Sequence, residues 1–176
     1  KEYNSLKDIN KDDILEHVKL ITALYPEVNK DNFTDEEITI VTAFTLMMNG
    51  EMTTSKEINK FVKDFAKMKN VEYLTLHAEG HRRPIDVINM IRHTNMKVGL
   101  AINPETKVSH IVPLLNHLDQ VLVMSVKPGK GGQKFMEDIL YKIETLRDIR
   151  EENGYHYLIN VDGGINEDTA KLVKEA

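Results

Sequence analysis

Gln120-Val-Leu-Val-Met124 runs directly into Ser125-Val-Lys-Pro-Gly-Lys-Gly-Gly-Gln-Lys-Phe135, and this junction decides the fold. The first run is apolar and predicts a buried parallel strand, which Pro128 and Gly129 end. A helix is expected straight afterwards, because apolar residues recur at helical spacing at Phe135, Ile139, Ile143 and Leu146. The order strand, glycine turn, helix directs free backbone N–H groups and the positive end of the helix toward an anion such as phosphate.

The same order recurs downstream. Tyr157-Leu-Ile-Asn-Val161 predicts a strand, Asp162-Gly-Gly-Ile-Asn166 a glycine turn, and a polar helical stretch with Asp168 and Thr169 near its start follows. Two such turns on neighbouring strands can share one phosphate. Neither is a Walker loop, because no Gly-Lys-Ser or Gly-Lys-Thr occurs at the required spacing. In the alternative interpretation the glycines only permit tight turns, at Gly131, Gly132, Gly163 and Gly164.

Composition limits the class of protein. The chain has 176 residues, of which 41% are hydrophobic and 29% charged, as expected for one globular domain with a sizeable core. It has no cysteine, which excludes disulfides and thiolate chemistry. A net charge of -5 argues against a general nucleic-acid surface but permits a local cationic pocket for an anionic metabolite. No long apolar run and no targeting or lipidation motif occurs in the sequence, so we expect a cytoplasmic location without membrane contact.

Strand and helix patterns alternate from residue 38 onward. Five strand-then-helix units are predicted, which indicates an α/β protein with a parallel sheet, either open or closed into a barrel. The expected strands cover 38–44, 71–77, 97–102, 120–124 and 157–161. The expected helices begin near Ser55, at Pro84, at Val108 (ending at Leu118), after the first glycine turn and near Asp168. We expect a single domain over residues 1–176, with a divergent helical start in residues 1–37 and the repeating units in residues 38–176.

Three stretches, in this order, resemble the ribulose-phosphate 3-epimerase family: Lys97-Val-Gly-Leu-Ala-Ile-Asn-Pro-Glu-Thr106, Leu122 to Phe135, and Val161-Asp-Gly-Gly-Ile-Asn166. Leu74-Thr-Leu-His-Ala-Glu79 is similar to the family's fourth strand. The resemblance covers residues 38–176 and implies a phosphate-binding (β/α)₈ TIM barrel with its site at the carboxyl ends of the strands. The barrel is expected to be incomplete, because the sequence shows neither the first two strands nor the eighth.

The resemblance also implies an isomerase of pentose phosphate metabolism, which interconverts ribulose 5-phosphate and xylulose 5-phosphate by proton exchange at C3. In that family two aspartates on opposite faces of the substrate move the proton, and a divalent metal ion (Zn, Fe, Mn or Co) steadies the enediolate. Asp162 matches the second aspartate, as proton carrier and metal ligand. The other matches are a wall residue, ceiling methionines and phosphate-facing glycines: His77; Met47 and Met124; Gly131, Gly132, Gly163 and Gly164. Outside this motif, Asp162 would be a helix N-cap or turn aspartate.

The sequence departs from the family pattern at the other metal-binding positions. Thr45 stands where the third strand normally carries histidine, and a hydroxyl is a poor ligand for transition metals. His-x-Asp, which the family's second strand normally carries, does not occur ahead of residue 38, and the nearest run there, His17-Val-Lys19, lies in an expected amphipathic helix. Lys127 and Lys130 replace the usual asparagine and aromatic residue of the first glycine turn, and they either meet a phosphate or face solvent.

These observations leave three functions open. The first is the epimerase just described, the second a catalytically inactive phosphosugar-binding homologue, and the third a hexulose-6-phosphate 3-epimerase, which the same loops would serve. The resemblance also implies a homo-oligomer. The strands that the pattern lacks have three explanations: a truncated or incompletely recorded chain, a rearranged family member, or a partner that completes the sheet. Glu79 is either a site carboxylate or, as we expect, part of a salt bridge at the end of a strand.

Overall fold

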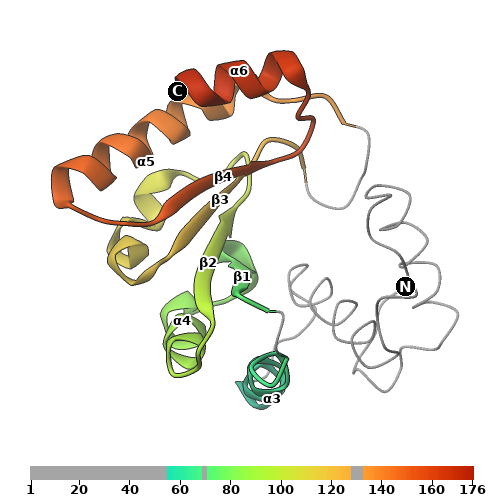
Figure 1. Ribbon diagram of the computed structural model, residues 1–176, viewed down its shortest axis with the longest axis vertical. Helices are drawn as coiled ribbons and strands as arrows, with labels where there is room; N and C mark the ends of the chain where they lie inside the picture. The colour runs from blue at the N-terminus through green and yellow to red at the C-terminus, as the bar shows by residue number, and fades with distance from the viewer. Residues whose placement is uncertain (1–54, 69–70, 128–132) are drawn as a thin grey trace, which may run out of the picture.

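The computed structural model describes residues 55–68, 71–127 and 133–176. At its centre lies a parallel sheet of four strands, side by side in the order in which they occur along the chain (Figure 1). The strands are β1 (Tyr73–His77), β2 (Lys97–Ile102), β3 (Gln120–Met124) and β4 (Leu158–Asp162). The α-helices are α3 (Ser55–Phe65), α4 (Pro84–Arg92), α5 (Leu140–Asn153) and α6 (Glu167–Glu175). Short 3₁₀ helices are η3 (Ala78–Gly80), η4 (Val108–His110), η5 (Val112–His117) and η6 (Glu137–Ile139).

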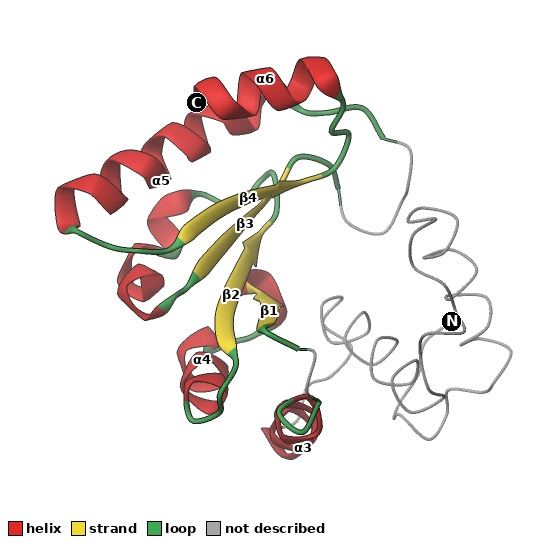
Figure 2. Ribbon diagram, viewed as in Figure 1, coloured by secondary structure: helices red, strands yellow, loops and turns green. Residues whose placement is uncertain are grey.

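Helical segments return the chain between successive strands, as parallel pairing requires. Helix α4 connects β1 to β2, the two segments η4 and η5 connect β2 to β3, and α5 connects β3 to β4. Figure 2 shows α4 and α5 on the same side of the sheet, with α6 lying against α5. One face of the sheet is therefore covered by helices.

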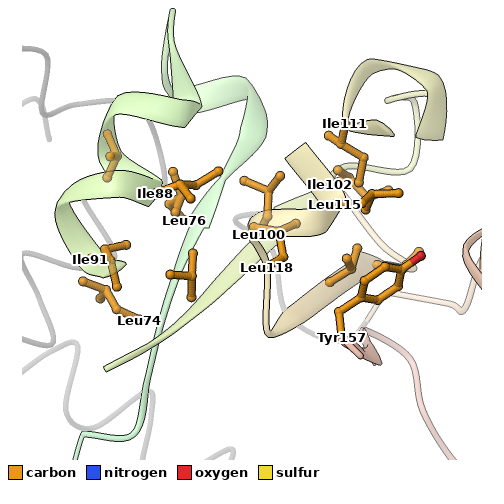
Figure 3. Close-up of a cluster of buried hydrophobic side chains, with 14 of the residues drawn as sticks. Leu74, Leu76, Ile88, Ile91, Leu100, Ile102, Ile111, Leu115, Leu118 and Tyr157 are labelled. Atoms are coloured by element: carbon orange, nitrogen blue, oxygen red, sulfur yellow. The ribbon is translucent and has the colours of Figure 1, made fainter. Parts of the chain in front are cut away.

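The core lies between the sheet and these helices. One row crosses all four strands in register, from Leu76 through Leu100 and Val121 to Ile159, and the first three of these side chains are fully buried. In Figure 3 the side chains of β1 meet Ile88 of α4. Alternate strand residues point to opposite faces, so this row fixes the direction of every other side chain in the sheet.

We call the opposite side of the sheet the inner face. Two rows cross it in register, and a shorter third row ends it at the carboxyl side: Thr75, Gly99, Gln120 and Leu158; His77, Ala101, Leu122 and Asn160; Met124 and Asp162. The first row is closely packed, because a Cβ on Gly99 would lie 2.1 Å from Thr75 Oγ1. On β4, by contrast, Leu158, Asn160 and Asp162 are all exposed.

Local signals explain several boundaries. Pro84 occupies the first turn of α4, where its missing N–H leaves no bond unmade. Helix α5 ends at Gly154, whose φ of 66° is the left-handed conformation typical of a helix end. Helix α6 begins with a capping box, in which the Asn166 side chain accepts from the N–H groups of Asp168 and Thr169.

Most expected elements are confirmed to within two residues. The strands predicted at 97–102 and 120–124 have the expected bounds, while those predicted at 71–77 and 157–161 run from Tyr73 to His77 and from Leu158 to Asp162. The last difference matters, because it makes Asp162 the final residue of a strand, with a side-chain direction set by the sheet.

The helix predicted from Val108 to Leu118 is wrong. The segment instead forms two 3₁₀ helices, η4 and η5, separated at Ile111. Pro113 lies in the first turn of η5 and cannot donate a backbone hydrogen bond, so a continuous α-helix through this position would lose a bond and meet the proline ring.

The helix expected straight after the first glycine turn begins later than predicted. Phe135 lies outside it, and α5 starts at Leu140 after the 3₁₀ segment η6. The reason is that the chain returning from the turn is first hydrogen-bonded to the residue after β3, because the Met136 N–H donates to the Ser125 carbonyl at 2.9 Å. The N-terminus of α5 therefore does not adjoin this turn.

Several predictions fall outside the described residues. These are the strand at 38–44, the helical start at 1–37, and the positions His17, Thr45, Met47, Lys130, Gly131 and Gly132. Within the described ranges, no helix has both the length and the apolar character needed to cross a bilayer.

Candidate functional site

The site residues predicted on β3 and β4 meet at the carboxyl edge of the sheet. Met124 ends β3 and Asp162 ends β4, and the two are direct register partners on the inner face. Met124 is buried at 6% exposure, whereas Asp162 is exposed. Parallel strands place their carboxyl ends at one edge, which is where α/β folds bind ligands.

Ser125 joins the two segments that leave these strands. This residue is fully buried, its N–H donates to the Asp162 carbonyl at 2.8 Å, and its hydroxyl lies within hydrogen-bond distance of the carbonyls of Asp162 and Gly163. Its own carbonyl accepts from Met136. One small residue thus ties the end of β3 to the end of β4 and to the chain that returns from the first glycine turn.

The second glycine turn packs directly against the returning chain. A Cβ on Gly163 would lie 2.4 Å from the Val126 side chain, and one on Gly164 would lie 2.5 Å from the backbone nitrogen of Phe135. Both glycines have positive φ, of 117° and 61°, which side-chain-bearing residues rarely adopt. The second glycine turn therefore lies directly against Val126 and Phe135, the described residues on either side of the first turn.

The backbone N–H groups of Gly163 and Gly164 donate to no acceptor within the described residues. Those of Asp168 and Thr169, in the first turn of α6, are already bound by the Asn166 side chain. An anion at this edge would therefore bind the glycine amides and not the first turn of the helix. These two amides are therefore available to donate to a ligand, although the glycines are also required by the turn itself.

The Asp162 carboxylate has no hydrogen-bond or ion-pair partner among the described residues. Its alternative role as an N-cap is not what the structure shows, since Asn166 caps α6. The carboxylate therefore stands free at the edge of the sheet, beside Met124, while its backbone carbonyl is fixed by Ser125.

The carboxyl ends of β1 and β2 are organised differently. His77 is buried at 4% exposure, and its Nδ1 lies 3.2 Å from Glu79 Oε2. The other carboxylate oxygen of Glu79 accepts from the Asn103 N–H at 2.8 Å and from the Thr106 hydroxyl. Burial raises the pKa of Glu79, but hydrogen bonds from His77, Thr106 and the Asn103 N–H outweigh it and lower the pKa from 4.5 to about 2. Glu79 is thus held at a strand end by hydrogen bonds.

Lys142 of α5 holds the segment that follows β2 in place. Its side chain emerges from α5, is 1% exposed, and donates from Nζ to three carbonyl oxygens in the segment after β2, those of Asn103, Pro104 and Thr106, at 2.9, 2.6 and 2.6 Å. Burial lowers the pKa of Lys142, against the attraction of Glu105 and Glu79. A polar atom in the same segment, Asn103 Oδ1, is buried without a partner among the described residues.

Lys127 belongs to the surface. Its ammonium pairs with Glu105 at 3.3 Å, and both side chains are largely exposed. The ion pair joins the segment after β3 to the segment after β2 across solvent-facing atoms. This geometry favours the prediction that the Lys127 side chain faces solvent and does not contact a phosphate.

Residues that could hold a metal ion do not gather in this part of the chain. Within the described ranges, no three His, Asp, Glu or Cys side chains come together in a suitable cluster. Asp162 has the right chemistry for a single ligand, while the Nδ1 of His77 is occupied by Glu79. The described residues by themselves do not form a metal centre.

Two residues of the site were not predicted from the sequence. Lys142 had a usable signal, because it lies three residues after Ile139 and four before Leu146, and so on the buried stripe of α5. Ser125 had none, because a serine after an apolar strand is typical of any loop. Its role depends on a contact with β4, which lies 37 residues away in the sequence.

Comparison with known proteins agrees with the geometry. A family model described as the ribulose-phosphate 3 epimerase family matches residues 32–176. The ribulose-phosphate 3-epimerase of Bacillus subtilis is 39% identical over 122 residues, which cover 69% of this chain and 56% of that protein. Those of Methanocaldococcus jannaschii and Candida glabrata are 40% and 38% identical over 121 residues, covering 69% of this chain and 50% and 47% of the relatives. The chain spans about half the length of the curated relatives it matches.

Proposed function

Because the chain belongs to the ribulose-phosphate 3-epimerase family, whose (β/α)₈ barrel its four parallel strands represent in part, we propose that it takes part in interconverting ribulose 5-phosphate and xylulose 5-phosphate by proton exchange at C3. One observation supports this proposal most directly. At the carboxyl edge of the sheet, the Asp162 carboxylate and the amides of the two glycines that follow it have no hydrogen-bond partner among the described residues.

In the proposed mechanism Asp162 is one of two proton carriers. Removal of the C3 proton breaks the C–H bond, and its electron pair moves into the C2 carbonyl to give an enediolate. Return of a proton to the other face of C3 gives the epimer. A carboxylate in contact with the reacting carbon can accept or return this proton, and such catalysis contributes about 10²–10⁴-fold. The second carrier is left unassigned.

The phosphate of the substrate is proposed to bind the amides of Gly163 and Gly164. Neither N–H has an acceptor among the described residues, and successive free N–H groups in a turn can bind an anion. Ser125 holds this turn against the end of β3. The distance between anion and carboxylate is thereby fixed by backbone, and Gly131 and Gly132 of the first turn are proposed to complete the site.

A divalent metal ion would stabilise the oxygens of an enediolate. The described residues do not fit such an ion by themselves, since Asp162 alone among them matches a family ligand. The roles proposed for Asp162 and for the glycine turn therefore involve only protein groups. The position of Met124 beside Asp162 supports its role as an apolar ceiling over the intermediate.

The second candidate is a sugar-phosphate-binding protein without turnover. It is favoured by Thr45, which stands where the family has a histidine, and by the absence of His-x-Asp from residues 1–37, where the family's second strand is expected. A hexulose 6-phosphate is the third possibility, because the glycine turn would hold its phosphate equally well. These candidates differ in a measurable property, namely the exchange of the C3 proton with solvent.

The test is the formation of xylulose 5-phosphate deuterated at C3 from ribulose 5-phosphate, a conversion that needs both proton carriers, measured in deuterated water with the full chain and added divalent metal. We expect Asp162→Asn to lower the rate of this conversion by about 10³-fold, equivalent to ~4 kcal/mol of barrier, because an amide cannot carry the proton. Asp168→Asn is the matched control, since that side chain is 93% exposed on α6, and its rate should stay within about twofold of the wild type.

Three results would contradict the proposal or change it. Equal conversion to xylulose 5-phosphate by Asp162→Asn and the wild type would remove Asp162 from the mechanism. No exchange in the folded wild type, together with thermal stabilisation by the sugar phosphate, would support binding without turnover. Exchange with a hexulose 6-phosphate but not with ribulose 5-phosphate would identify the third candidate.

A further inference from the structure

We propose that His77 contacts the substrate through its ring nitrogen Nε2, which accepts a hydrogen bond from a sugar hydroxyl, and that Glu79 and Lys142 are positioning residues that fix the ring and its tautomer. This inference rests on the proposed function, because it takes the ligand of the inner face to be an open-chain sugar phosphate. A chain of contacts leads from α5 to β1 and supports these roles.

The chain of contacts begins at Lys142. An ammonium group has three N–H donors and no acceptor, and in this structure each of the three has a carbonyl partner in the segment after β2. This arrangement leaves the ammonium nothing further to donate, so it has no group available for a ligand. Its effect is to hold the backbone of Asn103 and Thr106 in one place.

Asn103 and Thr106 in turn hold Glu79. The Asn103 N–H and the Thr106 hydroxyl both donate to Oε1, which leaves Oε2 to face His77 Nδ1. Because its pKa is lowered to about 2, Glu79 is an anion at neutral pH and can only accept hydrogen bonds. The proton between Glu79 and His77 must therefore be on Nδ1 of the ring.

This conclusion fixes the chemistry of the other ring nitrogen. In a neutral imidazole with its proton on Nδ1, Nε2 carries the lone pair and is an acceptor. His77 lies on the inner face, in register with Ala101, Leu122 and Asn160, one row before Met124 and Asp162. A sugar hydroxyl at this face can donate a hydrogen bond to Nε2. In the opposite tautomer Nε2 carries the proton and could not accept this bond.

The variant Glu79→Gln provides a sharp test, because an amide has only one acceptor oxygen. Two donors face Oε1 and one faces Oε2, so we expect the amide oxygen to take the Oε1 position and the NH₂ group to face His77. The ring must then accept at Nδ1 and carry its proton on Nε2. The substitution is nearly isosteric but should reverse the tautomer.

The experiment is long-range ¹H–¹⁵N correlation spectroscopy on the full chain with ring-labelled histidine, recorded at alkaline pH so that the imidazole is neutral. We expect the wild-type His77 ring to carry its proton on Nδ1, the Glu79→Gln ring to carry it on Nε2, and Lys142→Met to give a mixture of both forms. A wild-type proton on Nε2, or a tautomer unchanged by Glu79→Gln, would overturn the inference.

Kinetics give a second, independent readout. The glutamine amide oxygen reaches the position of Nε2, whereas the asparagine amide reaches only that of Nδ1. We therefore expect His77→Asn to lower kcat/KM for C3 exchange by about tenfold or more, the value of one lost hydrogen bond, and His77→Gln to retain most of it. Equal losses in the two folded variants would overturn the substrate contact.

The failure of this inference and the failure of the proposed function give different results. If the wild type shows no C3 exchange but the tautomer is on Nδ1 and is reversed by Glu79→Gln, the proposed function fails while the positioning of the ring stands. If the wild type exchanges normally and the tautomer does not respond to Glu79→Gln, the positioning role fails while the proposed function stands.

Discussion

The two pairs of strand ends on this sheet differ in how their polar groups are used. At the ends of β1 and β2, Glu79 accepts from three donors and Lys142 donates to three carbonyls. At the ends of β3 and β4, the Asp162 carboxylate and the amides of Gly163 and Gly164 have no partners among the described residues, and only the backbone around Ser125 is bonded. At the first pair of ends the polar groups are mostly bonded to one another, with Asn103 Oδ1 as an exception, whereas at the second pair they are left open.

This difference predicts that the residues at the ends of β1 and β2 contribute mainly to stability, and those at the ends of β3 and β4 mainly to function. Buried polar groups cost free energy unless they are paired, so the closed network at β1 and β2 is part of the folded structure. Exposed unpaired groups carry no such cost and remain available for a ligand. Substitutions in the first set should therefore change the free energy of unfolding, whereas Asp162→Asn should change turnover and leave unfolding nearly unaltered.

The largest effect on stability is expected from Lys142→Met. The variant keeps most of the side-chain volume but leaves the carbonyl oxygens of Pro104 and Thr106 without a donor among the described residues, at a cost of roughly 1–3 kcal/mol each when they stay buried. The Asn103 carbonyl still accepts from the Thr106 N–H. Because the segment after β2 can partly relax toward water, we expect a total loss of about 3 kcal/mol in the free energy of unfolding. Urea denaturation followed by circular dichroism measures it.

Lys171→Met is the matched control for that variant. Lys171 lies on α6 with its side chain 73% exposed, and its nearest charge partner, Asp168, is 3.7 Å away and exposed as well. Its replacement should change the free energy of unfolding by no more than about 0.5 kcal/mol. If the two variants were equally stable, the three carbonyl bonds would not be what holds the segment after β2.

A smaller difference in stability is expected between alanine substitutions at two glycines that have nearly the same φ. Gly164 has φ of 61° and Gly154 has φ of 66°, but a Cβ on Gly164 would lie 2.5 Å from the Phe135 nitrogen, while a Cβ on Gly154 would meet nothing within 4 Å. We expect Gly154→Ala to cost about 1 kcal/mol from backbone strain alone, and Gly164→Ala about 2 kcal/mol or more. Thermal unfolding of both variants measures the difference.

The outcome also bears on the open end of the sheet. If Gly164→Ala forces the two turn segments apart, the affinity for a sugar phosphate should fall together with stability, whereas Gly154→Ala should leave affinity unchanged. Equal destabilisation by the two substitutions would mean that the close approach between Gly164 and Phe135 contributes nothing.

The sheet could be predicted from the sequence because its strands carry local signals. The apolar runs at β2 and β3 end in proline or glycine, and both strands have their predicted bounds. The failures occurred where a local pattern competed with another constraint. The spacing from Val108 to Leu118 suits one helix, but Pro113 interrupts it. Phe135 fits the apolar stripe of α5, but the next residue, Met136, is still hydrogen-bonded to Ser125 just after β3.

The site was predictable only in part, for a related reason. Asp162 and the glycines after it stand in a motif that can be recognised along the chain, and strand pairing then places Met124 beside them. The Glu79 network depends on contacts between residues 24 to 39 positions apart, which no periodicity encodes. Lys142 could have been noticed as a charge on an apolar stripe, but its three acceptors are backbone carbonyls, which carry no signature in the sequence.

The smallest of the predicted effects is a loss of stability in acid. The folded-state pKa of Glu79 is about 2, below its ordinary value of 4.5, so the carboxylate stabilises the fold above pH 4.5 and this contribution disappears as the pH falls toward 2. The side chain is 30% exposed, and solvent screening reduces the effect to about 1 kcal/mol. The measurement is the difference in free energy of unfolding between the wild type and Glu79→Gln, which should shrink across this interval. Glu105→Gln, which removes only an exposed pair with Lys127, should show a much smaller change. If the difference stayed constant with pH, the loss of stability in Glu79→Gln would come from the altered hydrogen-bond geometry of the amide. The charge of Glu79 would then not stabilise this end of the sheet.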